Sequence, residues 1–389
     1  LAAEAAWHDL VRWCAAHGAP VRLGAAPVLD CGSHGWMGFV PQAPQLTAAA
    51  APEFWRRAGG LLAVMHLLRG SDLHHENVHV ADGVPVPVDL EAMLQPDLAL
   101  VPEVEPALRA DQAARRWLEG SVLAVGLLPR EQRLAGRPVR TGALAAAGEE
   151  TVGLSGWTAV NRDGMGFGTV TEPRPEGGIP ITIDGRPVTP GAGAEDLVQG
   201  YRAMIGFLAV KRRALLAADG PLAGFATARI RHVLRSTSYY EQLRQAGRHP
   251  AAQPDGVAWS RHFERPIPMA RWDLDDAPGA DAGWGLLAPE RAALLRDDVP
   301  VFTGRGAVDG CFAPDPAGGE AEVARGLLEP AVLPRLGARL DRLCREIEDH
   351  VGLIRQAMTG GEVPVLPPAR PWAVPFAVPE AAARAAVGA

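Results

Sequence analysis

One helix followed at once by a polar loop and a tight hairpin most restricts the fold of this chain. Pro52 opens the helical segment EFWRRAGGLLAVMHLLRG, and Gly70 stands where helices commonly end. Residues 77–80 and 84–88 then alternate like two strands, and the sequence Ala-Asp-Gly between them supplies the turn. The segment therefore predicts a helix, a loop and a β-hairpin in close succession, with His66 packed in the core on the apolar helix.

The chain has 389 residues, a length that suggests either one large unit or two subdomains. The patterns along the rest of the sequence predict a mixed α and β protein. A Pro- and Ala-rich tail over residues 361–389 resembles a linker. Strands are expected around a Gly-rich turn over 26–40, and loops with short strands over 129–195. Residues 249–285 read as irregular. Helical spacing is present over residues 4–17, 106–119, 194–217, 221–246, 288–297 and 320–358.

Composition excludes several classes of function. The net charge is −7, so the chain has no basic field with which to bind nucleic acid. No run of about 18 apolar residues is present, so no membrane span is expected. The four cysteines are scattered without a CxxC pair, which favours reduced thiols. We therefore predict a cytoplasmic protein with no nucleic-acid partner.

The stretch SDLHHENVHVADGVPVPVDLEAM, residues 71–93, gathers the chemistry-bearing side chains. Its histidines first suggest a metal site. His75 and His79 are four residues apart, but on a loop and a strand this spacing separates them too far for a compact site. No HExxH pattern and no nearby cysteine completes a zinc site. A histidine-based metal site is therefore the less favoured interpretation.

A second interpretation is phosphoryl transfer. Protein kinases place an Asp base five residues before a Mg²⁺-binding Asn, and a second metal-binding Asp follows a short hairpin. Here Asp72 and Asn77 have that spacing, and Asp89 follows the hairpin twelve residues after Asn77. Amide and carboxylate oxygens are the ligands that Mg²⁺ prefers. The alternative is a polar turn beside a solvated hairpin.

This block resembles the DxHxEN…DLE signature of the dehydratase domain of class II lanthipeptide synthetases (LanM). Other segments are similar to motifs of that family and follow in the same order. They include RHVLRSTSYY, which resembles RxxxRPTxxY but has Ser236 where proline is usual. The others are HGWMGFV (34–40), SVLAVGLLP (121–129), NRDGM (161–165) and RDDVPVF (296–302).

The resemblance implies an α+β fold over residues 1–360, with a protein/lipid-kinase-like C-lobe, additional helical elaborations and a largely missing N-lobe. It also implies a reaction in lanthipeptide biosynthesis. The family uses ATP and Mg²⁺ to phosphorylate Ser and Thr of a ribosomal precursor peptide, and then eliminates the phosphate to leave dehydroamino acids. The expected partner is therefore the precursor peptide, with a cyclase as a further domain or a separate protein.

In the first half of the reaction, the resemblance makes Asp72 the base toward the peptide hydroxyl, with His74 in the same loop. Asn77 and Asp89 are the expected Mg²⁺ and nucleotide ligands. Glu91, two residues beyond Asp89, resembles the acidic residue of the family at that place and is added to the metal set.

In the second half, Arg231 and Thr237 match positions that the family uses for elimination, and Arg235 matches the second arginine of the same motif. A guanidinium and a hydroxyl suit a departing phosphate. Spacing alone supports a different interpretation, in which Arg231 and Arg235 lie one turn apart on a solvated helix face.

Two alternatives to a dehydratase remain. One is a kinase-like phosphotransferase without elimination, and the other is a non-catalytic peptide-binding relative. A kinase needs a cation on the ATP phosphates, but no lysine precedes Lys211 and no Gly-rich phosphate loop precedes Asp72. In the family, a GDxHxxG segment and a YKPR strand come before this region. We therefore expect this chain by itself to be inactive.

Overall fold

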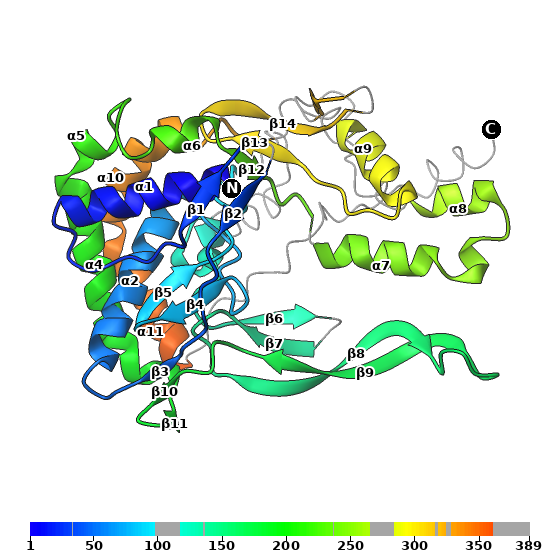
Figure 1. Cartoon of the computed structure of the whole chain (residues 1–389), viewed down its shortest axis with the longest axis horizontal. Helices are drawn as coiled ribbons and strands as arrows, with labels where there is room; N and C mark the ends of the chain where they lie inside the picture. Colours follow the sequence, from blue (N-terminus) through cyan, green and yellow to red (C-terminus); the bar gives the residue numbers. More distant parts are fainter. Residues whose placement is uncertain are drawn as a thin grey trace, which may run out of the picture.

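The computed structural model describes residues 1–32, 34–97, 117–134, 137–235, 237–264, 284–315, 318–323 and 328–360. Within these residues, helices and strands are mixed, as the sequence predicts. Figure 1 shows a group of helices on one side and, beside them, a small hairpin of β4 (Val78–Ala81) and β5 (Val84–Pro87). A long two-stranded ribbon runs from there to the side of the molecule that holds helices α7 (Thr237–Gly247) and α8 (Gly256–His262). No helix among the described residues is both long and apolar enough to cross a membrane.

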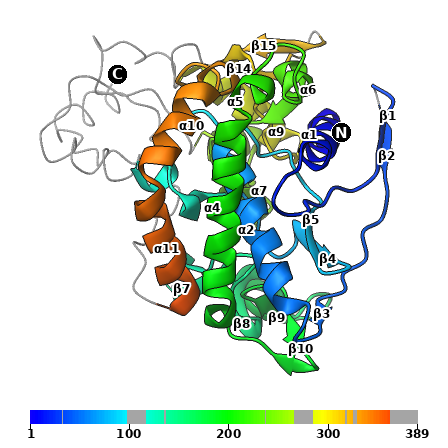
Figure 2. The ribbon, with the colours of Figure 1, turned by 90° about the vertical axis from the view of Figure 1, so that its left-hand side faces the viewer.

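Helices α2 (Ala51–Leu67) and α4 (Ala194–Val210) form the centre of the helical group (Figure 2). Thirteen of the seventeen residues of α2 are buried. A Cβ at Gly59 would lie 2.0 Å from the Leu197 carbonyl oxygen, and a Cβ at Gly200 would lie 1.9 Å from that of Arg56. The two helix backbones therefore touch, and only glycine fits at these points. The surrounding helices are α1 (Ala2–Ala16), α10 (Leu336–Arg345) and α11 (Ile347–Thr359).

The hairpin follows the sequence prediction. Strands β4 (Val78–Ala81) and β5 (Val84–Pro87) are antiparallel, and Val78 pairs with Pro87. Asp82 and Gly83 both have positive φ, 51° and 65°. Such a turn matches the twist of the flanking strands, which is why an Asp-Gly pair predicts it so strongly. The valines of both strands are buried, so the hairpin is anchored in the core.

The other strands form small sheets. β1 (Val28–Asp30) pairs with β2 (Gly35–Met37), in the segment where strands are expected. β6 (Arg130–Leu134) pairs with β7 (Arg137–Thr141), and β8 (Gly148–Thr158) with β9 (Gly166–Glu176). A three-stranded sheet contains β3 (Gln45–Leu46), β10 (Thr182–Ile183) and β11 (Arg186–Pro187), and a four-stranded sheet contains β12 (Arg229–Arg231), β13 (Thr303–Arg305), β14 (Val308–Pro314) and β15 (Glu320–Glu322).

Three predicted elements are wrong in detail. The helix expected over 221–246 is interrupted by β12, because Arg231 pairs with Thr303 across a sheet that local spacing does not reveal. The helix expected over 320–358 begins as β15 and becomes helical only from Leu333, where a short 3-10 helix leads into α10. The strands expected to be short within 129–195 include the ribbon β8–β9, eleven residues long on each side.

The remaining predictions agree more closely, except that residues 249–285, expected to be irregular, include helix α8 (Gly256–His262). The helices expected over 4–17 and 52–70 are α1 and α2. The helix expected over 288–297 is α9 (Trp284–Leu295). Residues 106–116 of the helix expected over 106–119 and the tail 361–389 lie outside the described residues. The other helices are α5 (Arg212–Leu215), α6 (Ala223–Thr227), α7 (Thr237–Gly247) and α8 (Gly256–His262).

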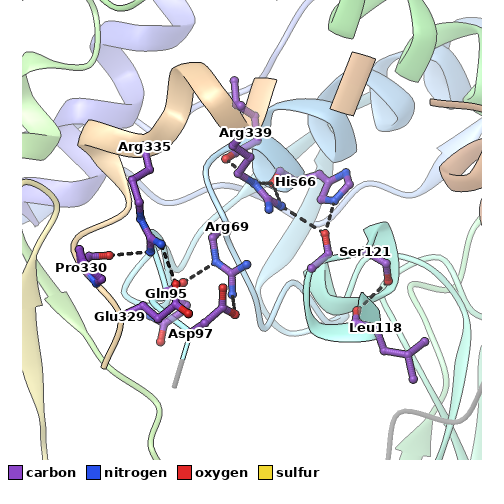
Figure 3. Close-up of polar contacts among 12 residues, drawn as sticks. His66, Arg69, Gln95, Asp97, Leu118, Ser121, Glu329, Pro330, Arg335 and Arg339 are labelled. Atoms are coloured by element: carbon purple, nitrogen blue, oxygen red, sulfur yellow. Dashed lines mark hydrogen bonds and ion pairs between the residues drawn. The ribbon is translucent and has the colours of Figure 1, made fainter. Parts of the chain in front are cut away.

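His66 is a packed core histidine, as predicted, with 1% of its surface exposed. Its Nε2 lies 2.8 Å from the Gly120 carbonyl oxygen and its Nδ1 lies 2.9 Å from the Tyr201 hydroxyl. Because a carbonyl only accepts, Nε2 carries the proton and Nδ1 accepts from Tyr201. The buried Arg339 donates to the carbonyl oxygens of His66 and Leu67 at the end of α2 (Figure 3).

Buried neutral histidines make the fold sensitive to acid. Burial lowers the pKa values of His350 and His232 to about 4, from 6.5 in an unfolded chain. Each folded-state pKa is depressed, so the stabilisation is complete above pH 6.5 and is lost as the pH falls toward 4. We expect the free energy of unfolding, measured with urea, to fall over this window by about 3 kcal/mol for each histidine.

The variant His350→Leu isolates one of these contributions. Its unfolding free energy should depend less steeply on pH between 6.5 and 4, whereas the control His17→Leu, at an exposed position, should keep the original slope. An unchanged slope in His350→Leu would contradict the assignment.

Candidate active site

The loop after α2 holds Asp72 in an unusual backbone conformation. Its φ is +66°, a region that favours glycine and that non-glycine residues adopt when the surroundings impose it. Backbone hydrogen bonds on both sides of Asp72 impose this conformation. Ser71 N donates to the Ala92 carbonyl oxygen, and Leu73 N donates to the Val125 carbonyl oxygen. Gly126 has φ +86°, and a Cβ there would lie 2.9 Å from Leu73 N. The loop is therefore held from both sides, and Gly126 allows the close approach.

Four charged groups act on the Asp72 carboxyl, one from its own loop and three from other segments. His74 Nε2 lies 3.6 Å from its Oδ1, within the same loop. Removal of water by the surrounding protein raises the pKa of Asp72; His74, Arg130 and Arg231 lower it, and Asp89 raises it. The side chain keeps 57% of its surface exposed, so it is open to a substrate. The predicted base thus lies near Asp89 and Arg231, in one electrostatic neighbourhood.

Asn77 and Asp89 lie at the open end of the hairpin. Val88 N donates to the Asn77 carbonyl oxygen, which places Asn77 opposite the residue before Asp89. Asn77 Nδ2 donates to the Asp72 carbonyl oxygen at 2.9 Å, so its Oδ1 is the atom left to bind a ligand. Asp89 Oδ1 accepts from Glu91 N at 3.1 Å. One amide oxygen and one carboxylate form a donor set that suits Mg²⁺, with water and phosphate oxygens as the usual remaining ligands.

Arg231 joins the two halves of the predicted site. Its Nη1 donates to Glu91 Oε1 at 2.5 Å, and its Nη2 donates to Thr237 Oγ1 at 3.1 Å. Its backbone N also donates to the Glu91 carbonyl oxygen at 2.9 Å. Gln95 adds a second link, because its Nε2 donates to the Arg231 carbonyl oxygen at 2.6 Å. Segments separated by 140 residues are therefore fixed together at the guanidinium.

Arg235 has a different setting from Arg231. Its side chain is 2% exposed and its Nε donates to Glu290 Oε1 at 2.5 Å. Tyr240 donates its hydroxyl to the same oxygen at 2.7 Å. Burial raises the pKa of Tyr240 far above its usual value, and Glu290 raises it further. The interpretation of Arg231 and Arg235 as a solvated helix face is therefore wrong: one lies on a strand, and the other is buried in an ion pair.

Three residues of this neighbourhood were not found from the sequence. Arg130, at the start of β6, lies close enough to Asp72 to shift its pKa, and its Nε donates to Thr141 Oγ1 at 3.4 Å. The one sequence feature that could have indicated Arg130 is its position directly after the segment SVLAVGLLP (121–129). No sequence pattern identified Gln95 or Glu290, because each forms its hydrogen bond with an arginine more than 50 residues away, Arg231 and Arg235 respectively.

The histidine-based interpretation of residues 71–93 finds no support among the contacts that the structure describes. His79 Nδ1 lies 2.7 Å from the Val40 carbonyl oxygen, so this ring is engaged with the backbone. Among the residues that the structure describes, no group of three or more His, Cys, Asp or Glu side chains is arranged to hold a metal ion. The Asn77 and Asp89 pair is of another kind, because it includes an amide oxygen and depends on further ligand oxygens from outside the protein.

A comparison with protein families places the chain. Residues 1–305 match the family described as Domain of unknown function (DUF4135). The chain belongs to this family. The match includes the polar loop, the hairpin and the segment from Arg231 to Thr237, so every predicted site residue lies within it. A comparison with curated proteins finds no match.

The buried pair of Arg235 and Glu290 gives a sharp test of what holds α7 in place. Arg235→Met leaves the Glu290 carboxylate buried with Tyr240 as its remaining donor among the contacts described above. We expect a loss of about 3–5 kcal/mol in the free energy of unfolding, measured with urea.

The double variant Arg235→Met/Glu290→Met removes both charges and should lose much less than the single variant. Arg202→Met, which breaks the exposed pair with Glu348, is the matched control and should have a much smaller effect. Equal losses in Arg235→Met and Arg202→Met would show that the buried pair does not hold α7.

Proposed function

We propose that this chain carries the catalytic residues of a lanthipeptide dehydratase, which phosphorylates Ser and Thr of a precursor peptide and then eliminates the phosphate. The observation that carries the proposal is the contact of Arg231 with both Glu91 and Thr237. This contact brings the residues expected for elimination beside the residues expected for phosphorylation. A phosphopeptide formed at Asp72 would therefore already lie next to the groups that receive its phosphate.

Asp72 is the proposed base for the first step. Its exposed carboxylate would accept the proton of the peptide hydroxyl as the oxygen attacks the terminal phosphorus of ATP, while the bond to the bridging oxygen breaks and ADP leaves. Partial loss of water around the carboxyl strengthens it as a base, while Arg130 and His74 favour its ionised form. Asn77 and Asp89 would hold Mg²⁺, which would neutralise charge on the phosphates when bound.

Arg231 and Thr237 are the proposed phosphate-binding groups of the second step. In the elimination a base takes the α-proton, the Cβ–O bond breaks so that phosphate leaves, and a Cα=Cβ double bond forms in the resulting dehydroamino acid. A guanidinium and a hydroxyl stabilise the leaving phosphate by charge and by hydrogen bonds. Arg235 is proposed as a positioning residue, because its buried pairing with Glu290 fixes the chain just before Thr237.

The deciding experiment is mass spectrometry of a precursor peptide incubated with the full-length protein, ATP and Mg²⁺. Loss of one water for each modified residue is the expected result. Gain of phosphoryl groups without water loss would favour the kinase without elimination. No mass change, with a nucleotide-binding lobe present, would favour the peptide-binding relative.

The role of Asp72 predicts a specific effect of Arg130 on pH dependence. Arg130 lowers the Asp72 pKa, so Arg130→Gln should raise it and move the acidic limb of the phosphorylation rate toward higher pH. The rate of phosphopeptide formation should be measured between pH 5 and 9. Asp72→Asn should abolish phosphorylation, and a limb that stays in place in Arg130→Gln would remove Arg130 from the site.

The role of Arg231 predicts a separation of the two steps. Arg231→Ala removes the proposed phosphate-binding guanidinium, so phosphorylated peptide should accumulate with an increase of about 80 mass units for each phosphoryl group, while dehydrated peptide falls at least tenfold. Arg229→Ala, two residues away on the same strand, is the matched control and should still dehydrate. Dehydration at the normal rate in Arg231→Ala would contradict the assignment.

A further inference from the structure

A pocket at the far end of α7 is not used by the chemistry proposed above. It has a volume of about 560 Å³ and is lined by residues that include Phe167, Ala246, His249, Ala251, Arg261 and His262. These residues come from the end of the ribbon β8–β9, from the last turn of α7, from α8 and from the segment that joins these two helices. Figure 1 shows both elements extending to the same side of the molecule.

Aromatic contacts connect the ribbon to this segment. The His249 ring stacks on Trp157, with centroids 6.0 Å apart and an angle of 7° between the rings. Phe167 meets the same ring edge-on, with centroids 5.6 Å apart. Offset-stacked and edge-on pairs are the favourable arrangements for such rings. The two ends are thus joined by packing, and the pocket lies beside the joint.

The lining of the pocket indicates what it would bind. The Phe167 ring and several alanine side chains give it an apolar wall. Arg261 adds an exposed cation, and it has no acidic partner among the residues that the structure describes. The volume is within the range of about 300–1,000 Å³ that ligand pockets commonly have. The fitting occupant is an apolar group with a negative charge beside it.

The pocket also lies at a defined distance from the proposed reacting groups. Helix α7 begins at Thr237, which contacts Arg231, and ends at Gly247, beside the pocket residue Ala246. Eleven helical residues span about 16 Å, at 1.5 Å per residue. An extended peptide covers that distance with about five residues.

We propose that this pocket is a subsite for the peptide substrate. It takes an apolar side chain about five residues from the reacting Ser or Thr, and Arg261 binds an acidic residue next to that side chain. The identity of the occupant as a substrate peptide rests on the proposed function. The pocket itself rests on the contacts of the ribbon, α7 and α8.

The test uses fluorescein-labelled synthetic peptides and the full-length protein without ATP. Each peptide of thirteen residues has one central Ser, and Leu or Ala stands five residues before or after it, next to Asp or Lys. Binding is measured by fluorescence anisotropy. We expect the peptide with Leu and Asp, on the side that reaches the pocket, to bind at least tenfold more tightly than the peptide with Ala and Lys.

Two variants locate this preference. Ala251→Trp, at an exposed lining position, should fill the pocket and abolish the preference for Leu. Arg261→Glu should reverse the charge preference, so that the peptide with Lys binds more tightly than the peptide with Asp. A loss of folding alone would not produce such a reversal. The matched controls Ala15→Trp and Arg213→Glu, at exposed positions in other helices, should bind all peptides as the unmodified protein does.

The pocket and the proposed function fail in different ways. If the unmodified protein shows no preference among the peptides, or if both variants retain it, the subsite is wrong even when the protein dehydrates a precursor. If the preference behaves as expected but no phosphoryl transfer or dehydration follows with ATP and Mg²⁺, the subsite stands and the proposed reaction is wrong.

Discussion

The carbonyl groups at the end of α2 are the constraint on which the rest of the structure depends. This end of the helix is buried, and an unsatisfied buried carbonyl costs about 1–3 kcal/mol. Arg339, more than 270 residues further along the chain, satisfies these carbonyl groups. Its Nε and Nη2 donate hydrogen bonds to the carbonyl oxygens of His66 and Leu67. Burial lowers the pKa of Arg339 to about 9, so it stays charged at neutral pH. Helix α10 and the loop that leads from α2 to Asp72 are thereby fixed to each other.

The position of Asp72 follows from that fixed point. The chain leaves α2 and turns through a positive φ at Arg69, whose Nη2 binds Asp97, before it reaches the positive φ at Asp72. Each such residue is unfavourable alone and persists because its neighbours impose it. At Asp72 the neighbours are the Ala92 and Val125 carbonyls and the backbone of Gly126. The strain therefore lies at the residue that we propose as the base, where a fixed carboxylate direction is useful.

Motifs within a short stretch of sequence predicted only those site residues that lie close together along the chain. Asp72, Asn77 and Asp89 lie within eighteen residues, and an Asp-Gly turn with alternating valines fixes the hairpin between them. The segment after residue 221 could not be read in the same way. Its helical spacing hid a strand whose partner, Thr303, is more than 70 residues away. Arg130 and Glu290 were missed for the same reason, since their roles come from contacts that have no counterpart in spacing.

The contacts of Arg231 also bear on how a phosphate would be both held and released. A guanidinium has five N–H groups in a fork, and Glu91 and Thr237 use one nitrogen each, so Nε and the outer hydrogens remain for a phosphate oxygen. The Glu91 carboxylate keeps the guanidinium aimed while repelling a dianion bound next to it. Binding that is too strong would trap the product, and a neighbouring negative charge limits it. In the proposed reaction, Glu91 thus acts twice, since it orients the cation before elimination and promotes loss of phosphate afterwards.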